Sequence, residues 1–141
     1  DLSIVETTKF TDIKAVMLAA GDEAVEAAKL LDYKIRPIFG MTGLDAASPE
    51  TFVKTILDEL AANYILPHSK STVLQDWMKG RHSEVNELNG LVVKALEAHG
   101  QKPPTNQAVV EFALAIERGE KTRGIHNYGP LLERIAELKS S

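Results

Sequence analysis

Residues 71–90 of the chain read STVLQDWMKGRHSEVNELNG, and this stretch predicts two helices separated by a short break. Thr72 begins a pattern with capping-box spacing, which places a helix start there. The first helix is expected to end at Gly80, and a second is predicted over 83–99 with Ser83 as its cap. Two helix starts lying close together leave several backbone N–H groups without helical partners, so this corner is suited to holding an anion or a ligand oxygen.

One acid falls among the apolar positions of the second predicted helix. Since a helix turns by about 100° per residue, Leu88, Leu91 and Ala95 lie within about 40° of Glu84. An ionised carboxylate on such a face is costly unless it is paired, hydrogen-bonded or placed at a solvent-filled cleft. Alternatively, an acid in the first turn only complements the helix dipole and reaches water past the helix end. Periodicity alone leaves both interpretations open.

The rest of the sequence is also helical in pattern. Apolar residues recur at helical spacing almost throughout, and no alternating strand longer than a few residues is found. Loops are expected at 33–43 and 118–129, where prolines or glycines interrupt the periodicity. We therefore predict an all-α protein, a single compact bundle of about six helices that forms one domain over 1–141. Besides the two helices of the corner, the predicted helices are 12–31, 48–66, 103–119 and 129–141.

Several local signals refine these helices. Gly21 interrupts the stripe of 12–31 and is expected to kink or split that helix. In the helix that begins near Pro49, the predicted buried face runs from Phe52 to Tyr64, and Pro67 ends the segment. The expected N-caps elsewhere are Ser3 in a capping box with Glu6, Ser48, and either Thr105 or Asn106.

Composition excludes several classes of function. The 141 residues carry a net charge of -4, so no overall basic field would attract nucleic acid or an anionic membrane. There is no cysteine, which removes disulfides, thiolate metal sites and cysteine nucleophiles. No apolar run approaches the roughly 20 residues of a membrane span, and no signal-peptide pattern is found. We expect a cytoplasmic protein, and a chain that begins at Asp1 is expected to be a piece of a longer one.

The polar residues of the corner resemble those of a known family. Order and spacing over about 69–112 are similar to those of the C-terminal helical domain of ketopantoate reductase (2-dehydropantoate 2-reductase). The residues that carry the resemblance are Ser71-Thr72-Val73-Leu74-Gln75-Asp76, Gly80-Arg81, Ser83-Glu84, Leu88-Asn89-Gly90, and Pro104 with Asn106.

This resemblance implies NADPH-dependent reduction of the keto group of ketopantoate, in pantothenate biosynthesis. The reaction would take place in a cleft between a Rossmann domain and this helical one. The family's glutamate at the position of Glu84 contacts the cofactor, and its substrate-binding serine corresponds to Thr72. Threonine keeps the hydroxyl, but its methyl group and the following Val73 leave open which 2-keto acid is the substrate.

The sequence also departs from the family's complete pattern. It contains no G-x-G-x-x-G, since "GMTG" at 40–43 is too short, and no K-x-x-x-N-x-x-x-N. The resemblance therefore implies that the Rossmann domain and the catalytic lysine lie upstream, with no catalytic residue in this chain, which by itself is expected to be inactive. The alternative is a stand-alone helical module for dimerisation or binding, without catalysis. A homodimer is open under either hypothesis.

Other candidate sites are weaker. The four histidines, at 68, 82, 99 and 126, have no metal-ligand spacing, and no metal site is predicted. Arg118, Lys121 and Arg123 could clamp a phosphate, but the nearby acids Glu117 and Glu120 favour a solvated loop. Trp77 is interpreted as a packing residue because its neighbours at helical spacing are apolar.

Overall fold

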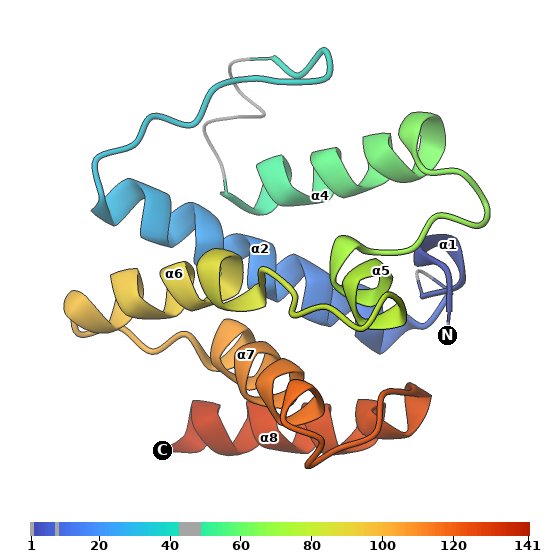
Figure 1. Ribbon diagram of the computed structural model, residues 1–141. Helices are drawn as coiled ribbons and strands as arrows, with labels where there is room; N and C mark the ends of the chain where they lie inside the picture. Colours follow the sequence, from blue (N-terminus) through green and yellow to red (C-terminus); the bar gives the residue numbers. More distant parts are fainter. Residues whose placement is uncertain (1, 8, 43–48) are drawn as a thin grey trace. The chain divides into compact units, whose positions relative to one another are not determined.

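The computed structural model describes residues 2–7, 9–42 and 49–141, and within these ranges it is all helical (Figure 1). Seven α-helices and no β-strand are found in the described residues, which confirms the predicted all-α class. The contacts group the chain into two compact units, Ser3–Ser69 and a second one formed mainly by Lys70–Ser141. Each unit is described separately, and the single domain expected over 1–141 stays a prediction.

The first unit begins with the predicted capping box. The hydroxyl of Ser3 accepts a hydrogen bond from the Glu6 backbone N–H at 3.2 Å, and Glu6 Oε2 accepts one from Ser3 N–H at 2.7 Å. This reciprocal pair starts the short helix α1 (Ile4–Thr7) and confirms that prediction. Ser48, the other cap expected in this unit, lies outside the described residues.

Helices α2 (Thr11–Leu30) and α4 (Pro49–Glu59) pack against each other in this unit. Gly21 does not split the helix, because α2 runs through it without interruption. A Cβ atom added at Gly21 would lie closer than 3.0 Å to Val53 Cγ1. The glycine therefore allows the close approach of the two helices at this point.

The end of the predicted helix 48–66 has a different geometry from the one expected. After α4 the chain forms a π-helical turn over Leu60–Tyr64, in which the N–H of Ile65 donates to the carbonyl of Leu60. A π turn contains more residues than an α turn, so it shifts the buried face. As a result Ala61 and Tyr64, both predicted to be buried, are exposed, and the Tyr64 ring contacts Phe39 at 4.8 Å between ring centroids.

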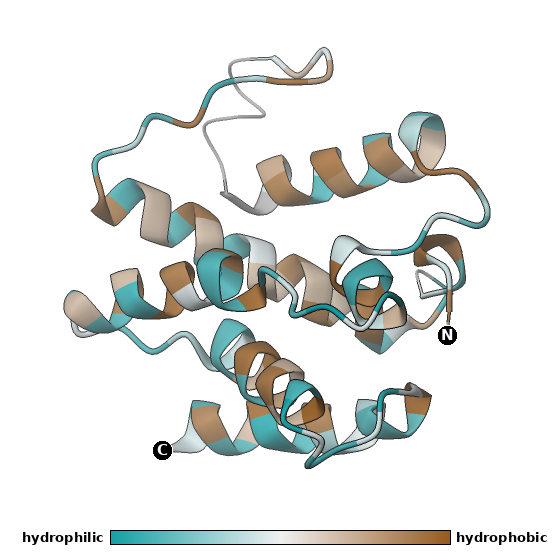
Figure 2. Cartoon of the chain, in the orientation of Figure 1, coloured by the Kyte–Doolittle hydropathy of each residue, from teal (hydrophilic) through white to brown (hydrophobic). Residues whose placement is uncertain are grey.

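The second unit contains the remaining helices and carries the candidate site. Helix α6 packs on α7, and α7 packs on α8; hydrophobic and hydrophilic residues alternate around each of them (Figure 2). The buried apolar residues include three small alanines of α7, which let neighbouring helices approach closely. The helices of this unit are α5 (Thr72–Met78), α6 (Val85–Ala98), α7 (Pro104–Glu117) and α8 (Tyr128–Ser140), with a 3-10 turn at Ile125–Asn127.

The start of α7 corrects another predicted cap. Pro103 occupies the N-cap position, and no side chain caps the helix. Thr105 and Asn106, the two candidates, lie inside the first turn with only 1% of their surface exposed. Asn106 faces α6 instead, where its Oδ1 accepts a hydrogen bond from Asn89 Nδ2 at 2.8 Å. Contact with a neighbouring helix has thus replaced the local cap.

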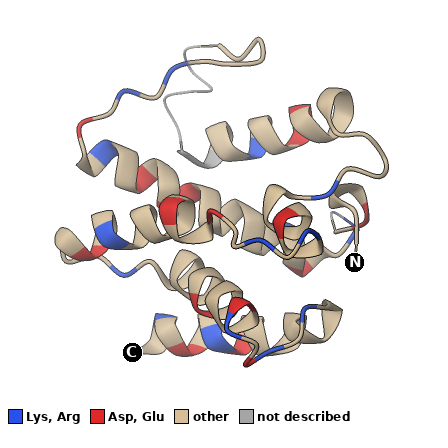
Figure 3. Cartoon of the chain, viewed as in Figure 1, with Lys and Arg blue, Asp and Glu red and all other residues tan. Residues whose placement is uncertain are grey.

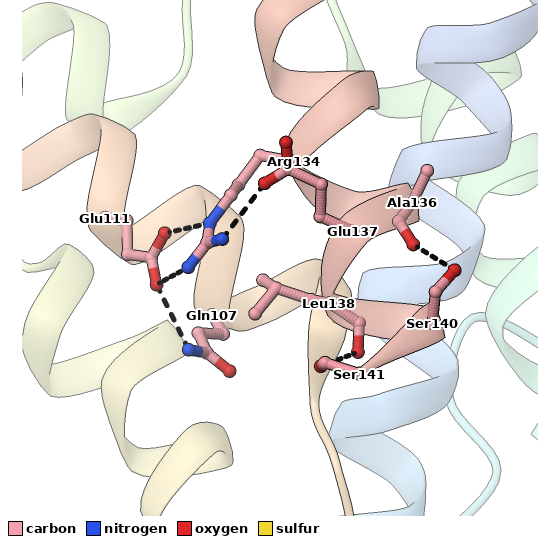
Figure 4. Close-up of polar contacts among 8 residues, drawn as sticks. All are labelled: Gln107, Glu111, Arg134, Ala136, Glu137, Leu138, Ser140 and Ser141. Atoms are coloured by element: carbon pink, nitrogen blue, oxygen red, sulfur yellow. Dashed lines mark hydrogen bonds and ion pairs between the residues drawn. The ribbon is translucent and has the colours of Figure 1, made fainter.

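Helix α8 is joined to α7 by a two-point ion pair (Figure 4). Arg134 donates from Nε to Glu111 Oε2 at 2.7 Å and from Nη2 to Glu111 Oε1 at 3.1 Å. Gln107 and Glu137 complete the cluster, through bonds to Glu111 and Arg134 respectively. The planar guanidinium matches the carboxylate at both oxygens, which fixes how the two helices are aligned.

Candidate functional site

The corner between α5 and α6 has the predicted helix–turn–helix form. We call residues 79–84 the α5–α6 turn. Gly80 has a φ of +69°, a left-handed conformation that favours glycine and ends α5. Arg81 closes the turn on α5, because its backbone N–H donates to the carbonyl of Asp76 and its guanidinium donates to the Asp76 carboxylate, both at 2.9 Å.

Ser71, rather than Thr72, is the N-cap of α5. Ser71 has extended backbone angles, and its Oγ accepts a hydrogen bond from Leu74 N–H at 3.3 Å. Thr72 is the first residue inside the helix, so the capping role predicted for it is wrong. Its exposed side chain is therefore not engaged in the capping bond of α5.

The predicted cap of α6 is corrected in the same way. Glu84 occupies the N-cap position and its side chain makes no capping hydrogen bond. Ser83, the expected cap, is 8% exposed, and its hydroxyl donates to Glu117 on α7 at 2.6 Å. The Ser83 hydroxyl, which local spacing predicted to cap α6, is bound instead to a residue of another helix.

The position of Glu84 among apolar residues now has a structural explanation. The face of α6 that carries Glu84, Leu88 and Leu91 is exposed, and the two leucines keep 56% and 58% of their surface. The core of the unit is formed from the neighbouring face, which contains Val85 and Leu96 at 1% and 2% exposure. The carboxylate of Glu84 therefore lies at the surface, where its charge is not removed from water.

Thr72 and Glu84 line one open hollow of about 470 Å³. Charges of both signs are found along this corner (Figure 3). Lys79 and Arg81 bring positive charge to the hollow, and the Asp76 carboxylate is paired with Arg81. The hollow is further lined by Gln75 and His82.

Glu117, at the end of α7, binds the residues of this corner through its carboxylate. It was not identified from the sequence as part of the site. Its side chain is 8% exposed. Oε1 accepts hydrogen bonds from Ser83 N–H at 2.8 Å, Ser83 Oγ at 2.6 Å and Trp77 Nε1 at 3.0 Å, and Oε2 lies 3.1 Å from His82 Nδ1. Burial alone would raise the pKa of this carboxyl, but the hydrogen bonds together outweigh it and lower the pKa to about 2.

One signal in the sequence could have pointed to Glu117. Glu117 follows Ala113 and Leu114 by four and three residues, so it falls on a partly buried face of its helix. Interpreting it as one acid of a solvated loop overlooked that spacing. Trp77 was interpreted as a packing residue; it is half-buried, and its indole N–H also binds the Glu117 carboxylate.

The α5–α6 turn also borders a second open hollow, of about 300 Å³. Arg81 and His82 line both hollows, and Arg123 contributes to the second one. The basic residues considered as a phosphate clamp have other partners: Arg118 pairs with Glu120 at 2.6 Å, and the Lys121 ammonium lies 4.6 Å from the centre of the Phe112 ring. This arrangement supports the solvated-loop interpretation.

In the part of the chain that the structure describes, no three histidine, aspartate or glutamate side chains come together as metal ligands would. Among the same residues, no helix is both long enough and apolar enough to cross a membrane.

The fold and the corner define a helical domain with an open polar hollow at a helix–turn–helix junction. The family model described as "Ketopantoate reductase PanE/ApbA C terminal" matches residues 1–117, which is well over half of the chain. The chain therefore belongs to this family of ketopantoate reductase C-terminal domains. No curated protein and no solved structure matches the chain. The matched segment ends with Glu117, so α8 and the loop before it lie beyond it.

Proposed function

We propose that this chain is the substrate-side domain of an NADPH-dependent 2-keto acid reductase that converts ketopantoate to pantoate in pantothenate biosynthesis. The observation that supports the proposal is that Thr72 and Glu84, to which the resemblance assigns substrate and cofactor contacts, line the same hollow in a chain of that family. In the intact enzyme the hollow would face a Rossmann domain that binds the nucleotide.

The chemistry of the hollow fits such a ligand pair. Glu84 is exposed and makes no capping bond, so its carboxylate is open to accept hydrogen bonds from hydroxyl or amide groups of the cofactor. NADPH supplies the hydride when it is bound. The exposed hydroxyl of Thr72 can donate to an oxygen of the 2-keto acid, and the Lys79 ammonium can attract its carboxylate, whereas Arg81 is already paired with Asp76.

The proposal is tested with the intact protein that carries this chain and the family's nucleotide-binding domain. We expect NADPH to be oxidised with ketopantoate, and Glu84→Gln to lower kcat/KM by roughly 10- to 150-fold with little change in Tm. Glu87→Gln is the matched control, because Glu87 is another exposed acid at the start of α6 and does not line the hollow. It should leave both quantities unchanged.

Thr72 is tested by two replacements. Because Ser71 caps α5, changes at Thr72 leave the capping bond in place. We expect Thr72→Ser to retain substrate affinity, and Thr72→Val, which keeps the shape but removes the hydroxyl, to raise KM by roughly 10-fold. If none of the 2-keto acids tested supported oxidation of NADPH by the intact protein, this result would contradict the proposed function. An effect of Glu84→Gln on Tm alone would contradict the role given to Glu84.

A further inference from the structure

We propose that Glu117 is a positioning residue of this site, which holds the α5–α6 turn against α7 and thereby sets the separation of Thr72 and Glu84 across the hollow. The inference rests on the proposed function, because the hollow must bind the reactants for its geometry to matter. It adds a residue from the last position of α7 that itself does not line the hollow of Thr72 and Glu84.

The contacts of Glu117 reach both ends of the turn. Trp77 lies near the end of α5, and Ser83 directly precedes Glu84 at the start of α6. One carboxylate oxygen accepts from the Trp77 indole N–H and from both polar groups of Ser83, at distances of 2.6 to 3.0 Å. The other oxygen lies 3.1 Å from His82 Nδ1, within the turn. A single side chain therefore ties three residues of the corner to α7.

A carboxylate suits this task for two reasons. Hydrogen bonds to an ionised oxygen are shorter and stronger than those to a neutral one, so they restrict the turn more. The charge is also well compensated, since the oxygens of this largely buried group are occupied by donors from the turn and from α5. Helix α7 packs on α6, so the backbone that carries the Glu117 carboxylate is held in place.

The internal bonds of the corner do not supply the same restraint. The two bonds between Asp76 and Arg81 close the turn on α5, and Ser71 caps the start of that helix. Neither set reaches α7. Gly80, in a left-handed conformation, lies between the two ends that Glu117 holds. Loss of the Glu117 bonds is expected to let Ser83 and Glu84 move relative to Thr72, with α5 and α6 themselves intact.

The first test uses the 141-residue chain and its only tryptophan, which gives one indole N–H signal in a nitrogen–proton NMR spectrum. We expect Glu117→Gln to shift the Trp77 indole signal, to speed its exchange with solvent by at least about 10-fold, and to perturb the amides of residues 79–84. Glu111→Gln is the matched control: it changes another acid of α7 that binds a different helix, and should leave these signals in place. Unchanged indole and turn signals in Glu117→Gln would overturn the proposal.

The second test measures the reaction in the intact protein. We expect Glu117→Gln to lower kcat/KM by roughly 10- to 100-fold, because small misplacement of reacting groups is costly. Glu111→Gln should leave kcat/KM within about 2-fold, even where it lowers Tm comparably. Equal kinetic constants for both variants, per mole of folded protein, would show that Glu117 is only structural and would overturn the proposal.

Two further variants show whether Glu117 acts through Ser83. Ser83→Ala removes the hydroxyl donor and keeps the backbone N–H, so a smaller loss in kcat/KM is expected. The double variant with Glu117→Gln should lose less than the product of the two single effects, because both changes weaken the same hydrogen bond between Ser83 and residue 117. Independent effects would contradict action through Ser83. An intact wild-type protein without reductase activity would instead overturn the proposed function, while the NMR test still decides whether Glu117 holds the turn.

Discussion

Ser83 donates a 2.6 Å hydrogen bond from its hydroxyl to Oε1 of Glu117, a residue 34 positions later in the chain. The same oxygen also accepts the backbone N–H of Ser83. Ser83, which was expected to be a helix cap, therefore connects the turn that carries Glu84 to the end of α7. We therefore expect the loss of the Glu117 carboxylate to affect both the geometry of the site and the stability of the fold.

Acid should weaken the fold through Glu117. Its pKa is about 2 in the folded chain and near 4.5 when unfolded, so its stabilising effect is fully present above pH 4.5 and is lost as the pH falls towards 2. Since the side chain is nearly buried, the difference corresponds to roughly 3 kcal/mol at neutral pH. Urea unfolding of the wild type and of Glu117→Gln should therefore differ most above pH 5 and converge near pH 2. A gap that is independent of pH would contradict this assignment.

Gly21→Ala should destabilise the first unit. The added methyl group would meet Val53 Cγ1 at less than 3.0 Å, and overpacking of this kind costs about 1–3 kcal/mol. Gly129→Ala in α8 is the control, because an added Cβ has no neighbour within 4 Å there and alanine favours a helix. Thermal unfolding should show a lower Tm for the first variant only. Shortening Val53 to alanine in the Gly21→Ala background should recover part of the loss, and a failure to recover any would exclude this clash as the cause.

Arg134→Gln should loosen α8 from α7. The pKa of the Glu111 carboxyl is held below its usual value chiefly by its hydrogen bonds with Arg134, so removing the guanidinium should raise it. An NMR titration of Glu111 measures this directly, and amide exchange should speed up along α8. Arg118→Gln removes an exposed arginine paired with Glu120 in the loop and should change neither quantity. Equal exchange along α8 in both variants would show that the two-point pair does not hold the helix.

Two leucines of α6 should respond very differently to truncation. Leu96 is 2% exposed in the core, and Leu96→Ala should cost about 2–5 kcal/mol. Leu88 lies on the exposed face with Glu84, so Leu88→Ala in the 141-residue chain should change stability by less than about 0.5 kcal/mol. Urea unfolding of both variants measures the difference. A large loss in Leu88→Ala would mean that this face of α6 is covered in solution.

Local patterns predicted which segments are helical, because a helix is stabilised by bonds between residues three or four positions apart. The Ser3–Glu6 capping box and the break at Gly80 depend only on such neighbours, and the structure confirms both. The polar residues around Thr72 and Glu84 were likewise enough to indicate the family, which the match over residues 1–117 confirms. The roles of Thr72 and Glu84 stay predictions.

Tertiary contacts decided what periodicity could not. Neighbouring residues can each serve as the N-cap of a helix. Ser83 does not cap α6 because the fold brings the Glu117 carboxylate within hydrogen-bonding distance of its hydroxyl. The sequence around Gly21 does not show which residue lies against it, and only the fold brings Val53 there. Helix α7 covers only part of the apolar arc of α6. The sequence does not indicate which part is covered and which part, the one that contains Glu84, stays exposed. Each of these choices depends on contacts between different helices, which lie beyond the reach of the backbone bonds that set helical periodicity.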